Sequence, residues 1–434
     1  MNKKSSSTIK ALLLAWVMFG LAGTSNAQDD FTYHADPPRM TLTRSQFILS
    51  DIPFCSNGQV ICYSPKFIRE AYNFPANLDG RGQTILLVDA YGSPTIRHDL
   101  AVFDELFGIP DPPSFTILCP QGGCPHYNPR NPHGEVTWAV ETTLDVEYAH
   151  AMAPAANIVL VVGENGTGNA INAAEAKAIK LYPGSVMSQS FGIPEILVRG
   201  NKFQILQAHK IFEDAAAAGI TVLAGAGDFG ATNAFATANP DFPASDPLVL
   251  AVGGTEGNPY QGGLAGCSAG TCTEVYGGEQ VWNEFNFATG GAQSFFFLAP
   301  PYQTALGLKH RTTPDVAYNA AIHGGVVVAN SSVEGIDMLL LIGGTSAAAP
   351  QWAGIIALAN QAAGRPLGFV NPAIYQVSMS SAYANDFHDI TVGNNQAAGT
   401  PVGFSAGPGY DFATGWGTPN VANLIPDLIA AVSH

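Results

Sequence analysis

Between residues 84 and 254 the sequence alternates short apolar runs, each bounded by turn residues, with longer segments whose apolar residues have helical spacing. The apolar runs are residues 84–92, 156–163, 186–192, 221–228 and 248–254. A strand followed by a helix, repeated several times, predicts a mostly parallel central sheet covered by helices on both faces. We therefore expect an α/β fold of three layers. Functional residues are expected beyond the carboxyl ends of the strands, where ligands bind to such sheets.

The first 27 residues have the pattern of a secretory signal peptide. Three lysines precede an apolar run at residues 11–22, and small residues follow it up to Ala27. The run is short for a membrane-spanning helix, which needs about 20 apolar residues, so a membrane anchor is disfavoured. We expect cleavage after Ala27 and a secreted or periplasmic protein without membrane association. The remaining chain divides into a short N-terminal segment, 28–63, and one large domain, 64–434.

The charge balance of the chain is acidic. It has 34 Asp and Glu against 18 Lys and Arg, a formal net charge of −16. Such a chain has no basic patch that would bind nucleic acid. Because Lys and Arg are few, protonating the carboxylates at low pH leaves little positive charge to repel itself. The composition therefore suits an acidic environment.

Six cysteines fall into three close pairs, which are Cys55 with Cys62, Cys119 with Cys124, and Cys267 with Cys272. In an exported protein such cysteines are typical of disulfides. Short loops close most easily, so we expect the three local pairings. A metal site is the alternative, but no pair has the Cys-x2-Cys spacing of zinc sites.

Two carboxyls share one face of the helix predicted at residues 135–151. Glu141 and Asp145 are four residues apart, which places their Cβ atoms about 5–6 Å from each other. Apolar residues surround the pair, and residues 135–152 contain no Lys or Arg. Two carboxyls in an apolar setting should share a proton, with one pKa raised. That is the arrangement a carboxylate general base requires, whereas an acidic solvated face is the alternative.

Asp228 and Ser346 each follow an apolar run. Asp228 closes the run 221–228, where a turn residue is the simplest interpretation. A protonated Asp in this place could also donate a hydrogen bond to an oxyanion. Ser346 opens a predicted helix, whose first N–H groups and positive dipole end lie beside the hydroxyl. An N-cap is the alternative role for this serine, and no histidine lies nearby in the sequence to activate it.

The motif "GGTSAAAP" around Ser346 resembles the nucleophile motif of the sedolisins, the serine-carboxyl peptidases, which are related to subtilisins in fold and use glutamate in place of histidine. The resemblance runs from about Ser64 to Pro419 and includes "AVETTLDVEYAHAMAP", "ITVLAGAGDFGAT", "FPASDPLVLAVGGT" and "AGPGYDFATGWG". It implies a subtilisin-like three-layer fold with a mostly parallel central sheet and helices on both faces. It also implies a monomeric, secreted enzyme that hydrolyses protein or peptide substrates at acidic pH through an acyl-enzyme.

The resemblance further implies roles for individual residues. Glu141 matches the general base of the family, and Asp145 matches the acid that orients it. Asp228 matches the oxyanion-binding acid, and Ser346 matches the nucleophile. The family also binds one Ca²⁺ near the carboxyl terminus. The matching ligands are the carboxylates of Asp389 and Asp411 and the backbone carbonyls of Ile390, Gly407 and Gly409. Oxygen ligands of this kind suit Ca²⁺, so residues 64–434 are expected to form a sedolisin-like peptidase domain with a C-terminal calcium-binding region.

The chain departs from the family pattern in three places. Only residues 28–63 separate the expected signal peptide from the domain, where the family has a large prodomain. Phe191 stands in Ser-Phe-Gly where Ser-Trp-Gly is frequent, and Ala292 stands where another glycine is commoner. These departures concern zymogen control and subsite preference, and they leave the four catalytic positions intact.

Two other functions are considered. A histidine-dependent subtilisin would use Asp89 as its acid and would need a histidine at a helix start, for which His133 is the only candidate. His150 is nine residues from Glu141 and faces away from it on the helix. A secreted binding or adhesion protein that keeps the fold without catalysis is the second alternative. The presence of all four catalytic side chains weighs against it.

Overall fold

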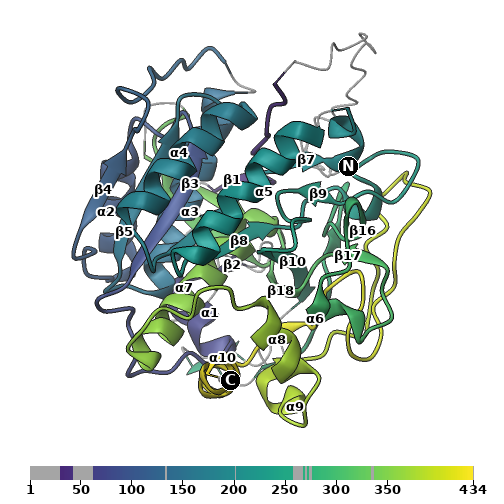
Figure 1. The fold of residues 1–434 in the computed structure, drawn as a ribbon. Coiled ribbons are helices and arrows are strands. Elements are labelled where there is room, and N and C mark those ends of the chain that lie inside the picture. The colour runs from purple at the N-terminus through teal and green to yellow at the C-terminus, as the bar shows by residue number, and fades with distance from the viewer. Residues whose placement is uncertain are drawn as a thin grey trace, which may run out of the picture.

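The computed structural model describes residues 30–42, 62–131, 134–200, 202–257, 276–333 and 337–433, and the backbone of residues 267–268 and 271–272. Its centre is an eight-stranded sheet in the order β13-β10-β8-β6-β3-β5-β4, with β18 as a further partner of β10. Its neighbouring strands are parallel, except that β13 is antiparallel to β10. The strands are β3 (Thr84–Ala90), β4 (Phe115–Leu118), β5 (Asn157–Gly163), β6 (Val186–Gln189), β8 (Thr221–Gly225), β10 (Val249–Gly257), β13 (Glu279–Val281) and β18 (Val316–Asn319). The predicted mostly parallel sheet is confirmed (Figure 1).

Helices cover both faces of this sheet. Ile85 and Leu87 of β3 pack into one hydrophobic cluster, and Leu86 and Val88 pack into another, because successive strand residues point to opposite faces. One cluster includes residues of α2, α3 and α7, and the other includes residues of α4 and α5. Figure 1 shows α4 and α5 side by side in front of the sheet. The bounds are α2 (Ile96–Phe107), α3 (Glu135–Met152), α4 (Gly168–Leu181), α5 (Lys202–Ala217) and α7 (Thr345–Ala363).

Helices α3 and α7 lie inside the molecule and pack against each other. α3 is buried from Val136 to Met152, and α7 is buried from Thr345 to Asn360. The two backbones approach closely at Gly354, where a Cβ atom would lie 2.4 Å from the Cβ of Met152. A helix buried on all sides has no solvated face, so the carboxyls of α3 are removed from water.

A second sheet connects the N-terminal segment to the start of α7. Its strands lie in the order β1-β20-β19-β2. They are β1 (Arg39–Leu42), β2 (Cys62–Tyr63), β19 (Gly325–Asn330) and β20 (Met338–Ile342). β1 is antiparallel to β20, which in turn is antiparallel to β19. Only Gly343 and Gly344 separate β20 from α7. The N-terminal strand β1 is therefore paired with the strand that leads directly into the helix carrying Ser346.

The C-terminal region contains a helix for which the sequence analysis made no prediction. α10 (Val421–Val432) packs its apolar face against α7 and α8 (Asn371–Ser378). The remaining elements are short: α1 (Pro65–Ala71), α6 (Pro301–Thr304), α9 (Tyr383–Asp386), η1 (Glu195–Val198), η2 (Gly230–Thr232), β7 (Ile193–Pro194), β9 (Asp241–Phe242), β11 (Cys267–Ser268), β12 (Thr271–Cys272), β14 (Asn283–Glu284), β15 (Phe287–Ala288), β16 (Gln293–Leu298), β17 (His310–Thr312), β21 (Phe387–His388) and β22 (Thr418–Pro419). In the part of the chain that the structure describes, no helix has the length and apolar character to span a bilayer.

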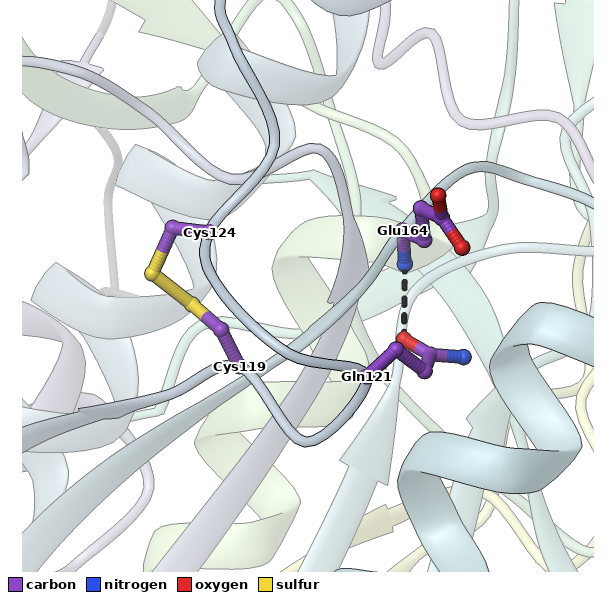
Figure 2. Close-up of a disulfide and its surroundings, with 4 residues drawn as sticks. All are labelled: Cys119, Gln121, Cys124 and Glu164. Atoms are coloured by element: carbon purple, nitrogen blue, oxygen red, sulfur yellow. Dashed lines mark hydrogen bonds between the residues drawn. A yellow bond between two sulfur atoms is a disulfide. The ribbon is translucent and has the colours of Figure 1, made fainter.

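One predicted disulfide is confirmed, between Cys119 and Cys124, whose Cα atoms are 5.0 Å apart (Figure 2). Within this loop the Gln121 side chain accepts a hydrogen bond from the Glu164 N–H at 3.0 Å and donates one to the Ala170 carbonyl at 2.6 Å. The disulfide therefore fixes a loop that docks on the segment after β5.

The other two predicted disulfides involve residues outside the described part of the chain. Cys62 is disulfide-bonded, but its predicted partner Cys55 lies outside the described residues. Cys267 and Cys272 are backbone partners in the β11-β12 pair, and their side chains also lie outside what the structure describes.

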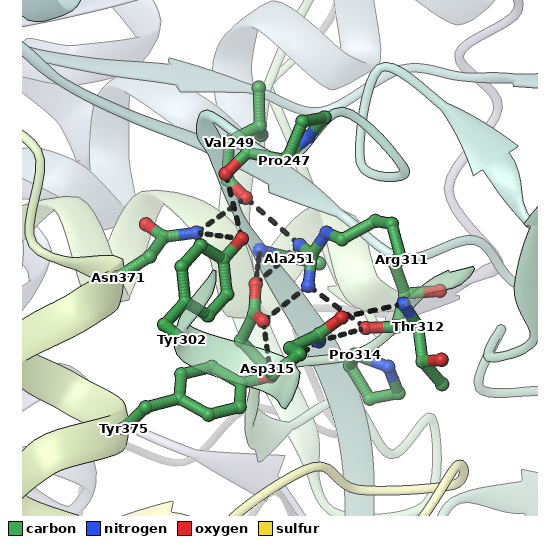
Figure 3. A network of polar contacts seen from close by, with 12 residues as sticks. Pro247, Val249, Ala251, Tyr302, Arg311, Thr312, Pro314, Asp315, Asn371 and Tyr375 are labelled. Carbon is green, nitrogen blue, oxygen red and sulfur yellow. Dashed lines mark hydrogen bonds and ion pairs between the residues drawn. The ribbon is translucent and has the colours of Figure 1, made fainter. Parts of the chain in front are cut away.

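A buried ion pair holds the far edge of the central sheet together. Arg311 donates to both carboxylate oxygens of Asp315, at 2.5 and 2.6 Å (Figure 3). The same carboxylate accepts from the Ala251 N–H of β10 at 2.8 Å and from the Tyr375 hydroxyl of α8 at 2.7 Å. Because the carboxylate is fully paired, the charge is tolerated in the interior, and β10, β17 and α8 are fixed relative to one another.

Candidate active site

Ser346 and Glu141 meet where α7 passes α3. The Ser346 hydroxyl donates a hydrogen bond to Glu141 Oε2, with Oγ and Oε2 3.1 Å apart. Glu141 is fully buried, and Ser346 keeps 8% of its surface exposed. The structure thus pairs a slightly accessible serine hydroxyl with a carboxyl from a helix about two hundred residues earlier in the sequence.

Asp145 lies one helical turn after Glu141 on the same side of α3, as predicted from the spacing. Its Oδ1 accepts a hydrogen bond from the Ser190 hydroxyl at 2.7 Å. Ser190 follows β6 and also lies 3.4 Å from the Ser346 carbonyl oxygen. The sequence analysis did not assign a role to Ser190, although its place directly after a buried strand is where functional residues are expected.

Asp89 is a third buried carboxyl beside this pair. It lies within β3 and has no exposed surface, and its charge contributes to raising the pKa values of Glu141 and Asp145. The sequence analysis considered Asp89 only as the acid of a histidine-dependent site. The histidine that such a site would need, His133, lies outside the described residues.

Burial raises the pKa of each of these three carboxyls. For Asp89 burial brings the pKa to about 8. For Glu141 burial acts first, followed by the charges of Asp145 and Asp89, and the hydrogen bond from Ser346 opposes them. For Asp145 burial again acts first, followed by Asp89. Since like charges in an apolar site disfavour one another, the three carboxyls share protons to a higher pH than free carboxyls do, and the hydrogen bond from Ser346 favours the ionised form of Glu141 among them.

Asp228 lies just beyond β8 and is joined to the start of α7. Its Oδ1 accepts from the Thr345 N–H at 2.8 Å and from the Thr345 hydroxyl at 2.9 Å. The Thr345 hydroxyl oxygen accepts in turn from the Gly227 N–H at 3.1 Å. Burial raises the pKa of Asp228 to about 6, against the two hydrogen bonds from Thr345. All four predicted catalytic residues therefore lie around the first turn of α7.

Gly344 makes the approach of Asp228 to α7 sterically feasible. Its φ is +93°, in the region that favours glycine. A Cβ atom at this position would lie 2.6 Å from Asp228 Oδ2. The glycine before the Thr345-Ser346 pair therefore serves both the turn and the carboxyl beside it.

The predicted calcium ligands come from two segments that lie side by side. The Asp389 carboxylate accepts from the Gly409 N–H at 3.0 and 3.1 Å, and Asp411 Oδ2 accepts from the Gly407 N–H at 3.0 Å. Within the described ranges no cluster of three or more His, Cys, Asp or Glu side chains could hold a metal. The predicted set contains only two carboxylates and otherwise uses backbone carbonyls, which is a donor chemistry that fits Ca²⁺.

Similarity to known proteins extends over most of the chain. Residues 129–417 match the subtilase family. Kumamolisin from Bacillus sp. (strain MN-32) is 34% identical over 387 residues, which cover 86% of this chain and 64% of kumamolisin. Sedolisin from Pseudomonas sp. (strain 101) is 33% identical over 278 residues, which cover 60% of this chain and 43% of sedolisin.

A solved structure gives the same result for the fold. The complex of Pseudomonas sedolisin (serine-carboxyl proteinase) with two molecules of pseudo-iodotyrostatin has a TM-score of 0.70 and 26% identity, covering 85% of this chain and 98% of that one. This chain spans 64% of the length of kumamolisin, and the subtilase match includes the regions of Glu141, Asp228 and Ser346. The chain therefore belongs to the subtilase family and, within it, to the sedolisins.

Proposed function

We propose that this protein is a serine-carboxyl peptidase that hydrolyses peptide bonds in protein or peptide substrates at acidic pH. The observation that carries the proposal is the hydrogen bond from the Ser346 hydroxyl to the buried Glu141 carboxyl. A serine hydroxyl is a weak nucleophile until an adjacent base takes its proton. Glu141 occupies the position of that base, and membership of the sedolisins supports the assignment.

In the first step, Ser346 Oγ attacks the substrate carbonyl while Glu141, in the ionised form that the hydrogen bond from Ser346 favours, takes the hydroxyl proton. Asp145 lies one turn further along α3 and accepts a hydrogen bond from Ser190. Together with burial, its charge raises the pKa of Glu141 and so makes Glu141 a stronger base. The C–N bond then breaks, the leaving nitrogen receives the proton from Glu141, and an acyl-enzyme on Ser346 remains. Water releases the acyl group by the same steps in reverse order.

Asp228 is proposed to stabilise the tetrahedral oxyanion as a neutral acid. Thr345 donates two hydrogen bonds to Oδ1, which leaves Oδ2 to carry a proton and donate it to the oxyanion. The Ser346 backbone N–H in the first turn of α7 supplies a second donor, because the first N–H groups of a helix have no partner within the helix.

Substituting Gly344 tests this geometry. Gly344→Ala is expected to lower kcat about 100-fold, the effect of losing one oxyanion donor, because the new Cβ would displace Asp228 Oδ2. Gly364→Ala is the matched control, since Gly364 ends the same helix with φ +64° and open space around its Cβ position. Kinetics with a peptide substrate would measure both variants. Equal losses in the two variants would show that strain in the backbone, and not contact with Asp228, reduces activity.

The pH dependence of activity follows from the proton on Asp228. With its pKa near 6, Asp228 is neutral below that pH, so we expect kcat to fall as the pH rises through about 6. Asp228→Asn keeps a neutral donor and is expected to extend activity to higher pH. A pH–rate profile of both proteins with a quenched-fluorescent peptide measures this shift. Full activity at pH 8 with none at pH 4 would refute the proposed function.

A secreted binding protein without catalysis is the second candidate. Casein digestion at pH 3–5 by the wild type, with Ser346→Ala beside it, separates the two. Digestion by the wild type alone supports the peptidase, whereas no digestion by either protein supports the binding protein. The signal-peptide pattern and the Cys119–Cys124 disulfide support the proposal that the protein acts outside the cytoplasm.

We also propose one Ca²⁺ site formed by the carboxylates of Asp389 and Asp411 with the carbonyls of Ile390, Gly407 and Gly409. The ion would neutralise the two carboxylates and fix the two segments to each other. Removing it with EDTA is expected to lower Tm by roughly 5–10 °C in the wild type.

The variant Asp411→Asn is expected to start with the lower Tm and to respond little to EDTA. Asp337→Asn, which alters an exposed ion pair with His98, serves as the control and should respond to EDTA as the wild type does. If EDTA leaves the Tm of the wild type unchanged, the calcium site is wrong.

A further inference from the structure

The residues 31–38, here called the N-terminal strap, form an extended strand between two segments next to the active site. On one side the Tyr33 N–H donates to the Gly166 carbonyl and the Gly168 N–H donates to the Phe31 carbonyl, both at 2.8 Å. On the other side His34 and Gly192 exchange two backbone hydrogen bonds, at 3.1 and 3.2 Å. A strand bonded along both edges is how an extended peptide is held in a binding groove.

The strap continues to the residues directly before α7 and is held there again. There the Gly343 N–H donates to the Pro38 carbonyl at 3.0 Å, and β1 then pairs with β20. Gly343 lies three residues before Ser346, and Gly192 lies two residues after Ser190. Between these two anchors only Ala35, Asp36 and Pro37 remain to cross the site.

Contacts at Gly344 place the end of the strap beside the catalytic groups. A Cβ atom on Gly344 would lie 2.9 Å from the Cδ of Pro38 and 2.6 Å from Asp228 Oδ2. The negative charge of Asp36 also contributes to raising the pKa of Asp228. Asp36 and Pro38 therefore occupy space near Asp228 that a substrate would need.

Tyr33 anchors the strap in an aromatic pocket. Its side chain is 1% exposed, and its ring lies 4.7 Å from that of Phe191 and 6.4 Å from that of Phe242, with stacked planes in the second case. Trp138 of α3 extends the pocket behind Phe191, at 5.7 Å between ring centroids. The side chains on either side of Tyr33 are exposed, as expected for a strand that buries alternate residues.

We propose that the N-terminal strap is a tethered inhibitor that fills the peptide-binding groove and that Ser346 does not cleave it. The proposal rests on the proposed peptidase function, because it assigns the groove next to Ser346 to peptide substrates. It also predicts that the pocket occupied by Tyr33 selects an aromatic side chain in substrates once the strap has left.

The sequence of the strap explains why it resists cleavage. Cleavage requires a new bond between Ser346 Oγ and a carbonyl carbon, loss of the C–N bond, and transfer of a proton from Glu141 to the leaving nitrogen. Asp36 is the middle residue between the two anchors, and the nitrogen after it belongs to Pro37. The next bond also ends at a proline nitrogen. The proline ring fixes φ and replaces the hydrogen on each of these nitrogens, so the leaving nitrogen cannot turn freely to meet the proton on Glu141.

Loosening the anchor tests occupancy of the groove. Tyr33→Ala is expected to raise kcat/KM for a quenched-fluorescent peptide at acidic pH about tenfold or more, since it removes the burial of an aromatic ring that holds the strap. Tyr33→Phe keeps the ring and should leave kcat/KM within about twofold of the wild type. Met40→Ala, an exposed change further along the same segment, should do the same. Equal kcat/KM for Tyr33→Ala and the wild type would overturn the proposal.

A binding measurement separates this proposal from the proposed function. The probe is a labelled peptide with the sequence of residues 31–38, and its anisotropy is measured with Ser346→Ala and with Ser346→Ala/Tyr33→Ala. The second protein is expected to bind the probe about tenfold more tightly, because its own strap competes less. If no variant hydrolyses any peptide, the peptidase function fails, and this binding arm still decides whether the strap fills the groove.

The resistance to cleavage is tested by replacing the prolines. Pro37→Ala/Pro38→Ala is expected to cut itself between residues 35 and 38 on incubation at acidic pH, as seen by intact mass. The same variant with Ser346→Ala should stay whole, which excludes another protease. A cut between residues 35 and 38 in the wild type would make the strap a substrate and overturn the proposal. An intact double-proline variant that still hydrolyses added peptides would overturn it as well.

Discussion

Replacing Ser346 with alanine is expected to lower kcat for peptide hydrolysis by about 10⁴-fold or more, because the acyl-enzyme can no longer form. The change removes one hydroxyl from a residue that is 8% exposed and leaves the Asp228–Thr345 hydrogen bonds in place. The fold should therefore be unaffected, and the residual rate should reflect the oxyanion-binding groups alone. Steady-state kinetics at acidic pH, with Tm measured beside them, tests this result.

A matched serine change supplies the control. Ser380 follows α8, away from the active site, and its hydroxyl donates to the Val377 carbonyl. Ser380→Ala removes this hydroxyl and should retain the kinetics of the wild type. If Ser346→Ala kept a kcat within tenfold of the wild type, Ser346 would not be the nucleophile. The hydrogen bond to Glu141 would then be structural.

Replacing Glu141 with glutamine is expected to lower kcat about 10³-fold, within the range that general-base catalysis contributes. Glutamine has nearly the same shape and still accepts a hydrogen bond from Ser346, but it cannot hold the proton that leaves the hydroxyl. The loss should fall on kcat more than on KM, since substrate binding is not altered. It should persist across the acidic range, because glutamine does not titrate.

Glu147→Gln on the same helix is the matched control. Glu147 is also fully buried with a raised pKa, caused first by burial, but its Oε2 accepts from the Ala329 N–H at 3.0 Å. It should therefore keep the kcat of the wild type. Comparable losses in Glu141→Gln and Glu147→Gln would indicate that buried charge on α3 in general, and not proton transfer from Ser346, supports activity.

The sequence predicted the layers of the fold and the paired carboxyls because both depend on local periodicity. Five apolar runs of strand length were enough to indicate the parallel sheet. The i, i+4 spacing of Glu141 and Asp145 was enough to place them on one face of α3. The apolar residues around the pair indicated a buried helix, with an acidic solvated face as the alternative, and the structure buries the helix from Val136 to Met152.

Features created by long-range packing could not be predicted in this way. Asp89 lies beside Glu141 only because β3 is packed against α3, and its strand pattern carries no sign of that contact. Asp228 fits a turn residue equally well until Thr345 is placed against it. The strap at residues 31–38 has no marked periodicity, and it becomes a strand through the edges that Gly166 and Gly192 offer it.

The buried carboxyls also make the proton a reactant in folding. Burial raises the pKa of Asp89 in β3 and of Glu175 in α4 to about 8, whereas in an unfolded chain both groups titrate at about pH 4. Their contribution to the free energy of unfolding is therefore complete below about pH 4 and is lost as the pH rises through about 8. At neutral pH the folding chain takes up protons from the buffer, and the unfolding chain returns them. Acid, which unfolds many proteins, thus behaves toward these groups as a ligand of the native state.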